Sequence, residues 1–128
     1  MKARKKDAIF LLIGATGYGL IEICWRGHTH WTMMVAGGIC FLLFSRIGVR
    51  FRRRSLLFRA GLAAGCVTTV EFFFGLVFNL GFGMKIWDYS ALPLNILGQV
   101  CLLYSVLWGA LGLIFVPFAE KLNRILEE

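Results

Sequence analysis

The feature that most constrains this chain is a series of four long apolar stretches separated by short polar or basic breaks. A helix needs roughly 20 apolar residues to cross a hydrocarbon core about 30 Å thick. Hydrophobic residues make up 59% of the chain, more than a water-soluble domain normally contains. We therefore predict an all-α, polytopic membrane protein in which residues 1–128 form a single domain of four transmembrane helices. The expected spans are about Ala8–Trp25, Trp31–Phe44, Leu56–Phe78 and Leu92–Phe118.

Two of these stretches have a second interpretation. The second stretch is short for a span, but Arg46 can reach the headgroups with its side chain and so lengthen it. The first stretch follows a basic segment, as the apolar region of a cleaved signal peptide does. It is too long for such a region and contains the carboxylate of Glu22, so we interpret it as an uncleaved helix.

The basic residues predict the orientation of the helices. The connections after the first and third stretches contain only Arg26 and Lys85 as basic residues, so the positive-inside rule places both termini and the Arg-rich connection in the cytoplasm (N-in/C-in). The net charge of +7 then reflects topology and does not indicate nucleic-acid binding. The basic residues of the cytoplasmic segments are Lys2, Arg4, Lys5, Lys6, Arg46, Arg50, Arg52, Arg53, Arg54, Arg59, Lys121 and Arg124.

The arginines at 50–54 have two interpretations. They can contact anionic lipids or an acidic partner. A role in setting the topology at the headgroups is favoured over such a contact.

Small residues recur at helical spacing within the apolar stretches. Gly61 and Gly65 form a GxxxG pair, which is typical of close packing between membrane helices. A second series, expected on the fourth helix, comprises Gly98, Cys101, Ser105, Gly109 and Gly112. The cysteines show no metal-ligand spacing, so we interpret all four as small packing residues: Cys24, Cys40, Cys66 and Cys101.

The two halves of the chain share a short pattern. Glu22 and Trp31, followed by Gly37, correspond to Glu71 and Trp87, followed by Gly98. This pattern suggests two helical hairpins related as parallel repeats about the membrane normal.

Two carboxylates, Glu22 and Glu71, lie inside predicted spans, where a charge is costly and usually serves a function. The alternative for Glu22 is a structural ion pair with Arg26, one turn later, and for Glu71 the role of a neutral, hydrogen-bonded packing group. Each belongs to a stripe of polar or small residues: Gly14, Tyr18, Glu22 and Arg26, and Thr68, Glu71, Gly75 and Asn79.

Further polar residues are expected near the outer membrane surface. Together with the two glutamates, the candidate substrate- or ion-binding residues are Asn79, Asp88, Asn95 and Gln99. His28 and His30 are weak candidates for a metal site, because an H-x-H spacing in a loop is unspecific. No cofactor is predicted, and no nucleophile with an adjacent base is visible.

Several motifs resemble those of a known group: His30-Trp31-Thr32-Met33 with Gly37-Gly38, Glu71 with Gly75 and Asn79, Trp87-Asp88-Tyr89-Ser90, and Asn95 through Gly98-Gln99-Val100-Cys101-Leu102 with Ser105 and Trp108. The pattern resembles the bacterial integral membrane family named putative ABC transporter permease, type IV (CmpB-like), and covers most of the chain. The family pattern has serine where Thr32 stands, which keeps the hydroxyl. The resemblance implies a multi-span, permease-like protein of the bacterial cytoplasmic membrane, without assigning a substrate or a site.

Three functions are compatible with these observations. The first is a transporter or permease subunit that moves a small polar solute or ion through an outward-facing polar cavity lined by the glutamates. Homo-oligomers are expected because one such bundle is small, and ATP-driven transport would need a separate ATPase because the chain has no phosphate-binding loop. The alternatives are an enzyme acting at the outer leaflet, whose acids and histidines converge, and a non-catalytic assembly subunit.

Overall fold

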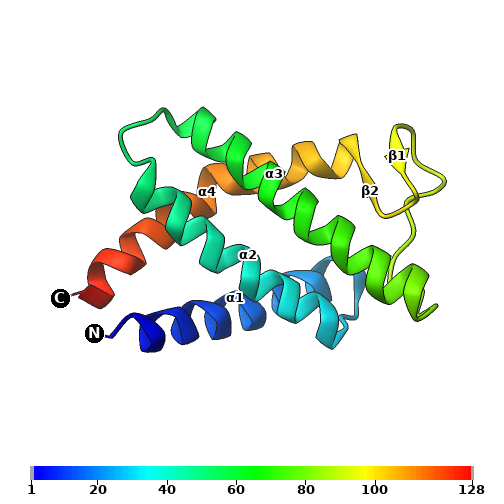
Figure 1. The fold of residues 1–128 in the computed structure, drawn as a ribbon, viewed down its shortest axis with the longest axis horizontal. Helices are drawn as coiled ribbons and strands as arrows, with labels where there is room; N and C mark the ends of the chain where they lie inside the picture. Colours follow the sequence, from blue (N-terminus) through cyan, green and yellow to red (C-terminus); the bar gives the residue numbers. More distant parts are fainter. Residues whose placement is uncertain (1, 128) are drawn as a thin grey trace.

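The computed structural model describes residues 2–127 and contains four long helices (Figure 1). All four are long and apolar enough to cross a membrane, which confirms the predicted all-α membrane fold. Their bounds are α1 Ala3–Arg26, α2 Trp31–Arg50, α3 Leu56–Phe74 with the π-helical continuation η1 Gly75–Gly81, and α4 Leu102–Glu127.

The helices are arranged as two antiparallel pairs. α1 packs on α2, and α3 packs on α4. α2 joins the pairs by contacting both α3 and α4, whereas α1 relies on α2 for most of its packing. The two hairpins expected from the sequence are therefore present, while their relation as repeats stays a prediction. The position of α1 at one side of the bundle leaves room between it and α4.

The connections between helices are formed by local capping interactions. Gly27 ends α1 in the left-handed conformation, with φ +82°, and donates its N–H to the carbonyl oxygen of Ile23. The side chain of His30 accepts the N–H of Thr32 and so caps the start of α2. Ser55 caps α3 in the same way, by accepting the N–H of Phe58.

Glycine permits the close approach of α1 and α2. A Cβ atom on Gly14 would lie 2.5 Å from the Cβ of Phe41, and one on Gly38 would lie 2.6 Å from the carbonyl oxygen of Leu11. Gly61 and Gly65, in contrast, have open space around the same position. The predicted GxxxG pair therefore lies on the outside of the bundle and does not pack against another helix of this chain.

We expect Gly38→Ala to lower the free energy of unfolding by about 1–3 kcal/mol, because the added methyl group collides with the backbone of α1. Gly61→Ala is the matched control, since its methyl group enters open space and should cause no loss. Unfolding of the purified protein in detergent, followed by circular dichroism, measures both. Equal destabilisation by the two substitutions would contradict this account of the α1–α2 contact.

The fourth helix begins ten residues later than the sequence predicts. Residues 82–101 form a loop outside the helices, in which β1 (Asn95–Ile96) pairs antiparallel with β2 (Val100–Cys101). Pro93 cannot donate a helical hydrogen bond, and Leu94, Leu97 and Gly98 have φ values of +56°, +53° and +71°. Asn95 and Gln99 therefore do not lie one helical turn apart, and neither Gly98 nor Cys101 belongs to the small-residue series on α4.

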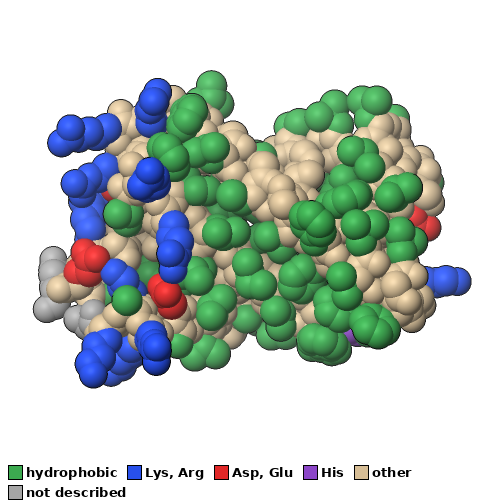
Figure 2. All heavy atoms as spheres, in the orientation of Figure 1, with side chains coloured by type: hydrophobic (Ala, Val, Ile, Leu, Met, Phe, Trp, Pro, Cys, Tyr) green, Lys and Arg blue, Asp and Glu red, His purple; other side chains and the backbone are tan. Residues whose placement is uncertain are grey.

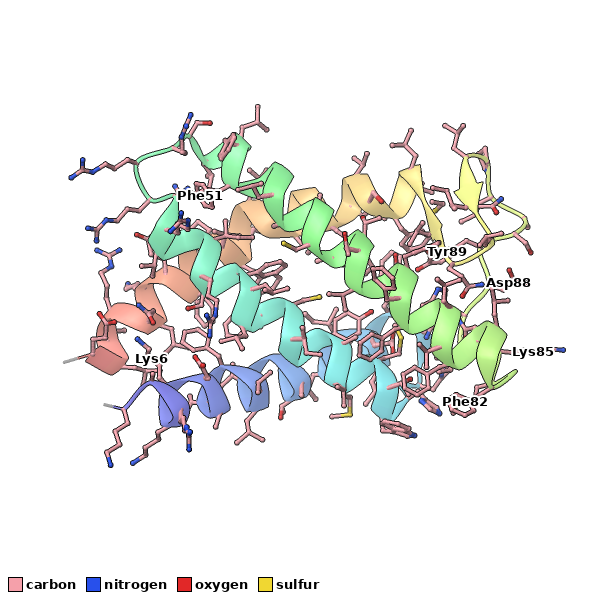
Figure 3. The ribbon with its side chains drawn as sticks, viewed as in Figure 1. Lys6, Phe51, Phe82, Lys85, Asp88 and Tyr89 are labelled. Carbon is pink, nitrogen blue, oxygen red and sulfur yellow. The ribbon has the colours of Figure 1, made fainter. Side chains whose placement is uncertain are left out.

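The charged residues gather at one end of the molecule. Lys and Arg side chains cluster at the end that holds both termini and the α2–α3 connection, whereas the middle is largely apolar (Figure 2). Ion pairs join helices at this end: Lys6–Glu127 at 2.8 Å, Asp7–Arg46 at 3.0 Å and Arg59–Glu120 at 3.1 Å. Phe82, Lys85 and Asp88 lie at the opposite end from Lys6, with Lys85 pointing outward (Figure 3).

Candidate functional site

A cleft of about 330 Å³ lies between α1 on one side and α3 and α4 on the other, with α2 as its floor. Its lining is mainly apolar and includes Ile13, Gly17 and Ile21 of α1 and Phe115 and Phe118 of α4. Ile13, Ile21 and Phe118 are also exposed at the surface of the bundle. The cleft therefore opens sideways, toward the lipid that would surround the helices.

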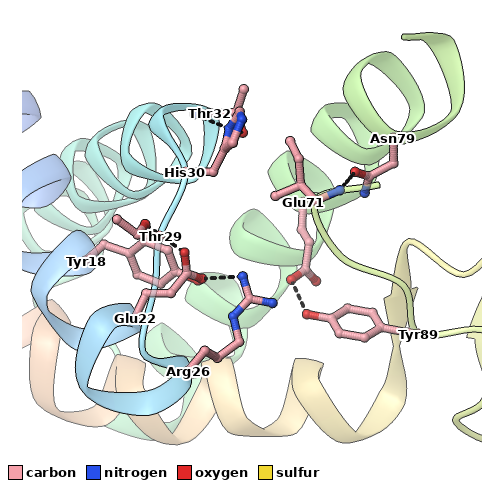
Figure 4. Close-up of polar contacts among 10 residues, drawn as sticks. Tyr18, Glu22, Arg26, Thr29, His30, Thr32, Glu71, Asn79 and Tyr89 are labelled. Carbon is pink, nitrogen blue, oxygen red and sulfur yellow. Dashed lines mark hydrogen bonds and ion pairs between the residues drawn. The ribbon is translucent and has the colours of Figure 1, made fainter. Parts of the chain in front are cut away.

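The polar side chains of the cleft are concentrated at the end nearest the 82–101 loop. There Glu71 is 6% exposed, and its carboxylate accepts a hydrogen bond from the Tyr89 hydroxyl at 3.0 Å (Figure 4). Its second oxygen accepts the indole N–H of Trp108 at 3.4 Å. Tyr18 and Trp87 also line this end of the cleft. Glu71 is thus buried and hydrogen-bonded, as the predicted packing role requires, and it also lines a cavity.

Glu22 is equally buried but has different partners. Its carboxylate forms an ion pair with Arg26 at 3.3 Å (Figure 4). It also accepts hydrogen bonds from the hydroxyl groups of Tyr18 at 3.2 Å and Thr29 at 2.8 Å. The ion pair predicted as the structural role of Glu22 is therefore present. Of the ion pairs among residues 2–127, none includes Glu71. The two glutamates differ in that Glu22 has a cationic partner and Glu71 has only neutral donors.

Asn79 and Gln99 hold the 82–101 loop against η1. The amide nitrogen of Asn79 donates to the side-chain oxygen of Gln99 at 2.8 Å, and its oxygen accepts the N–H of Ile86 at 2.7 Å. The backbone oxygen of Gln99 accepts the indole N–H of Trp87 at 2.9 Å, while its side chain packs directly on Gly75. These contacts keep Trp87 buried at the end of the cleft.

We expect Asn79→Ala to release this loop, because the change leaves the buried Gln99 side chain and the partly buried N–H of Ile86 without their hydrogen bonds, at a cost of about 1–3 kcal/mol for the buried group. Amide hydrogen exchange of residues 82–101 should then become at least about tenfold faster. Asn123→Ala is the matched control, because Asn123 is a buried asparagine on α4 whose hydrogen bond to Glu127 lies at the basic end. Unchanged exchange in Asn79→Ala would contradict the anchoring role.

Asp88 and Asn95 stabilise turns within the same loop. Asp88 accepts the N–H of Ser90 at 2.9 Å, and hydrogen bonds from Ser90 lower the pKa of this exposed carboxyl group. Asn95 donates to the carbonyl oxygen of Leu92 at 2.8 Å and accepts the N–H of Gly98 at 3.0 Å. Neither residue lines the cleft described above.

The two histidines do not form a metal site with acidic residues in the part of the chain that the structure describes. His30 Nδ1 lies 2.8 Å from the hydroxyl oxygen of Thr32, which accounts for its position at the start of α2. His28 is exposed in the connection before it. Among residues 2–127, no three His, Cys, Asp or Glu side chains are arranged so that they could hold a metal ion.

Tyr89 and Trp108 are site residues that were absent from the predicted set of binding residues. Tyr89 stacks on Tyr104 with ring centroids 4.7 Å apart, and burial, together with the neighbouring Glu71 carboxylate, raises the pKa of Tyr89 so that its hydroxyl remains a donor. Trp108 is 37 residues from Glu71 in the chain. In the sequence both residues belong to the motifs that carry the family resemblance, and no local pattern pairs either of them with Glu71.

The comparison with known proteins covers nearly the whole chain. A family model described as "Putative ABC-transporter type IV" (ABC_trans_CmpB) matches residues 9–127. This range includes nearly all of the four helices, the 82–101 loop and every residue of the cleft. No curated protein and no solved structure matches the chain. The family resemblance seen in the sequence is thereby confirmed, and the chain belongs to the family described as "Putative ABC-transporter type IV" (ABC_trans_CmpB).

Proposed function

We propose that this chain is a membrane-spanning subunit of a transporter and that a separate ATPase supplies its energy. Membership of an ABC-transporter family supports this role. The sequence has no Walker-type phosphate-binding loop, so ATP hydrolysis would take place on another subunit. The proposal assigns substrate contact to Glu71 and to the cleft on which this carboxylate opens.

The observation that carries the proposal is the environment of Glu71. A carboxylate in a membrane-crossing helix is costly unless it is paired or serves a function. Glu71 receives hydrogen bonds from Tyr89 and Trp108 but no ion pair among residues 2–127. Glu22, with Arg26 beside it, has a sufficient structural explanation. Glu71 is therefore the carboxylate available for a substrate.

The cleft is more apolar than the transport pathway that the sequence predicts. A mainly polar cavity lined by both glutamates was predicted, whereas most residues of the cleft are apolar and Glu71 is the one carboxylate in its lining. Asn79 and Gln99 contribute indirectly by holding Trp87 at the end of the cleft. A transported molecule would thus meet an apolar wall with one acidic group.

The proposed orientation places the Glu71 end of the cleft toward the outside of the bacterial inner membrane. The clustering of Lys and Arg at the end with both termini supports a cytoplasmic position for that end (Figure 2). A homo-oligomer would form through a surface outside the cleft. The outward-facing Gly61 and Gly65 provide a surface on which another membrane helix can pack closely.

Native mass spectrometry of the tagged chain, extracted from its own membrane in mild detergent, tests this proposal. We expect a complex that contains the chain, in one or more copies, together with a subunit that hydrolyses ATP. The same preparation should hydrolyse ATP in nanodiscs, and a chain isolated after high-salt removal of the partner should not. Recovery of the chain without any nucleotide-hydrolysing subunit would overturn the ATP-driven role.

A further inference from the structure

The shape of the cleft limits what it can hold. Along α4 its lining runs from Trp108 to Phe118, an advance of ten residues or about 15 Å along the helix. The volume of about 330 Å³ is at the lower end of the range for small-molecule sites. Since the opening lies between helices and is bordered by Ile13 and Ile21, an apolar molecule can enter it from the membrane.

The end of the cleft at Glu71 combines a carboxyl group with aromatic rings. Trp108 contacts Glu71 and lies beside Tyr18, with ring centroids 6.4 Å apart, and beside Tyr104 at 6.2 Å. Trp87 closes the same end and is 6% exposed. The faces of tryptophan and tyrosine rings attract cations, most strongly where water is excluded. This end is therefore electrostatically complementary to a positive charge.

We propose that the cleft binds a lipophilic organic cation, with its ammonium group beside Glu71 and the aromatic rings and its apolar part along α1 and α4. This substrate class rests on the proposed transport function and makes it more specific. A small inorganic cation is disfavoured, because it needs several oxygen ligands in place of its water shell and this end offers one carboxylate. An anionic amphiphile is disfavoured by the charge of Glu71.

Gly17 supplies a way to block the cleft without changing its charge. It lines the cleft on α1, and a Cβ at this position would meet no atom of the neighbouring elements within 4 Å. A leucine side chain there would therefore occupy the space of the ligand while leaving the helix contacts intact. Gly61 on α3 also has open space around it but lies outside the cleft, which makes Gly61→Leu the matched control.

The experiment is isothermal titration calorimetry of the purified chain in phosphatidylcholine nanodiscs, with empty nanodiscs as the reference. The probes are octyltrimethylammonium and octyl sulfate, which share an eight-carbon chain and carry opposite charges. We expect saturable binding of the cation and none of the anion. Glu71→Gln and Gly17→Leu should each weaken cation binding at least about tenfold, which corresponds to about 1.4 kcal/mol.

Two control variants separate site effects from general ones. Gly61→Leu should bind the cation as the wild type does, and so should Asp7→Asn, which removes a carboxylate at the basic end. Equal binding of octyl sulfate, or unchanged cation binding in Glu71→Gln, would overturn the proposal. A binding signal for sodium or potassium alone that Glu71→Gln removes would assign the site to an inorganic ion instead.

This measurement is independent of any ATPase. If the ATPase co-purifies but the organic cation does not bind, the substrate class is wrong and the transport role stands. If the cation binds and no ATPase is found, the cleft assignment stands and the ATP-driven role fails.

Discussion

Replacing Glu71 by glutamine is expected to reduce transport-coupled activity at least about tenfold while leaving the fold intact. The amide keeps the shape of the side chain; its oxygen can accept the indole N–H of Trp108 and its NH2 group can donate to the Tyr89 hydroxyl oxygen, but the group can no longer carry a negative charge. The assay is octyltrimethylammonium-stimulated ATP hydrolysis by the complex of this chain and its ATPase in nanodiscs. Unfolding in detergent, measured on the same samples, should differ little from the wild type.

A second variant serves as the control for this prediction. Glu120→Gln also removes a carboxylate from a helix, but Glu120 pairs with Arg59 at the basic end and does not line the cleft. Stimulated hydrolysis should therefore survive in Glu120→Gln. If both variants lost stimulation equally, the effect would come from the total charge of the bundle, and Glu71 would have no special position.

Removal of Arg26 is expected to be among the most destabilising single substitutions at the end of the bundle opposite the termini. Arg26→Met leaves the buried Glu22 without its cation, which costs about 3–5 kcal/mol for fully buried pairs. Because the Arg26 side chain is 31% exposed, water compensates part of this loss, and we expect about 2 kcal/mol. Unfolding in detergent, monitored by circular dichroism, measures the change.

A double-substitution cycle identifies the cause. Glu22→Gln introduced into Arg26→Met should recover a large part of the lost stability, because no unpaired carboxylate remains. Arg46→Met provides the comparison with an exposed pair, since both Arg46 and Asp7 are accessible to water and such pairs contribute about 0–1 kcal/mol. Failure of Glu22→Gln to recover stability would show that Arg26 acts through packing alone.

The sequence predicted the helices well because hydropathy depends only on which residues follow one another. The start of α4 was missed for the same reason, since Leu92, Leu94 and Leu97 extend the apolar run although the chain turns sharply there. Pro93 was the local signal that argued against a helix at this point. A run of apolar residues thus indicates that a segment is compatible with the membrane, but it does not determine the backbone conformation of that segment.

The candidate site was predictable only in part. The cost of a carboxylate in a span identified Glu71 and Glu22 from the sequence, and the spacing of four residues between Glu22 and Arg26 identified their ion pair. The contact of Trp108 with Glu71 depends on how α3 and α4 are rotated about their own axes. Packing across the bundle sets that rotation, and a GxxxG pattern does not reveal it, as the outward-facing Gly61 and Gly65 illustrate.

The sideways opening of the cleft has a consequence for how affinities must be compared. A ligand that arrives through the bilayer is in equilibrium with its concentration in the lipid phase, which partitioning raises above its aqueous concentration. Each added methylene favours transfer out of water by about 0.8 kcal/mol, or about fourfold, before any contact with the protein is made. Dissociation constants for a homologous series of ligands should therefore converge once they are expressed per mole of lipid, and they should shift with the lipid-to-protein ratio when they are expressed per volume of water.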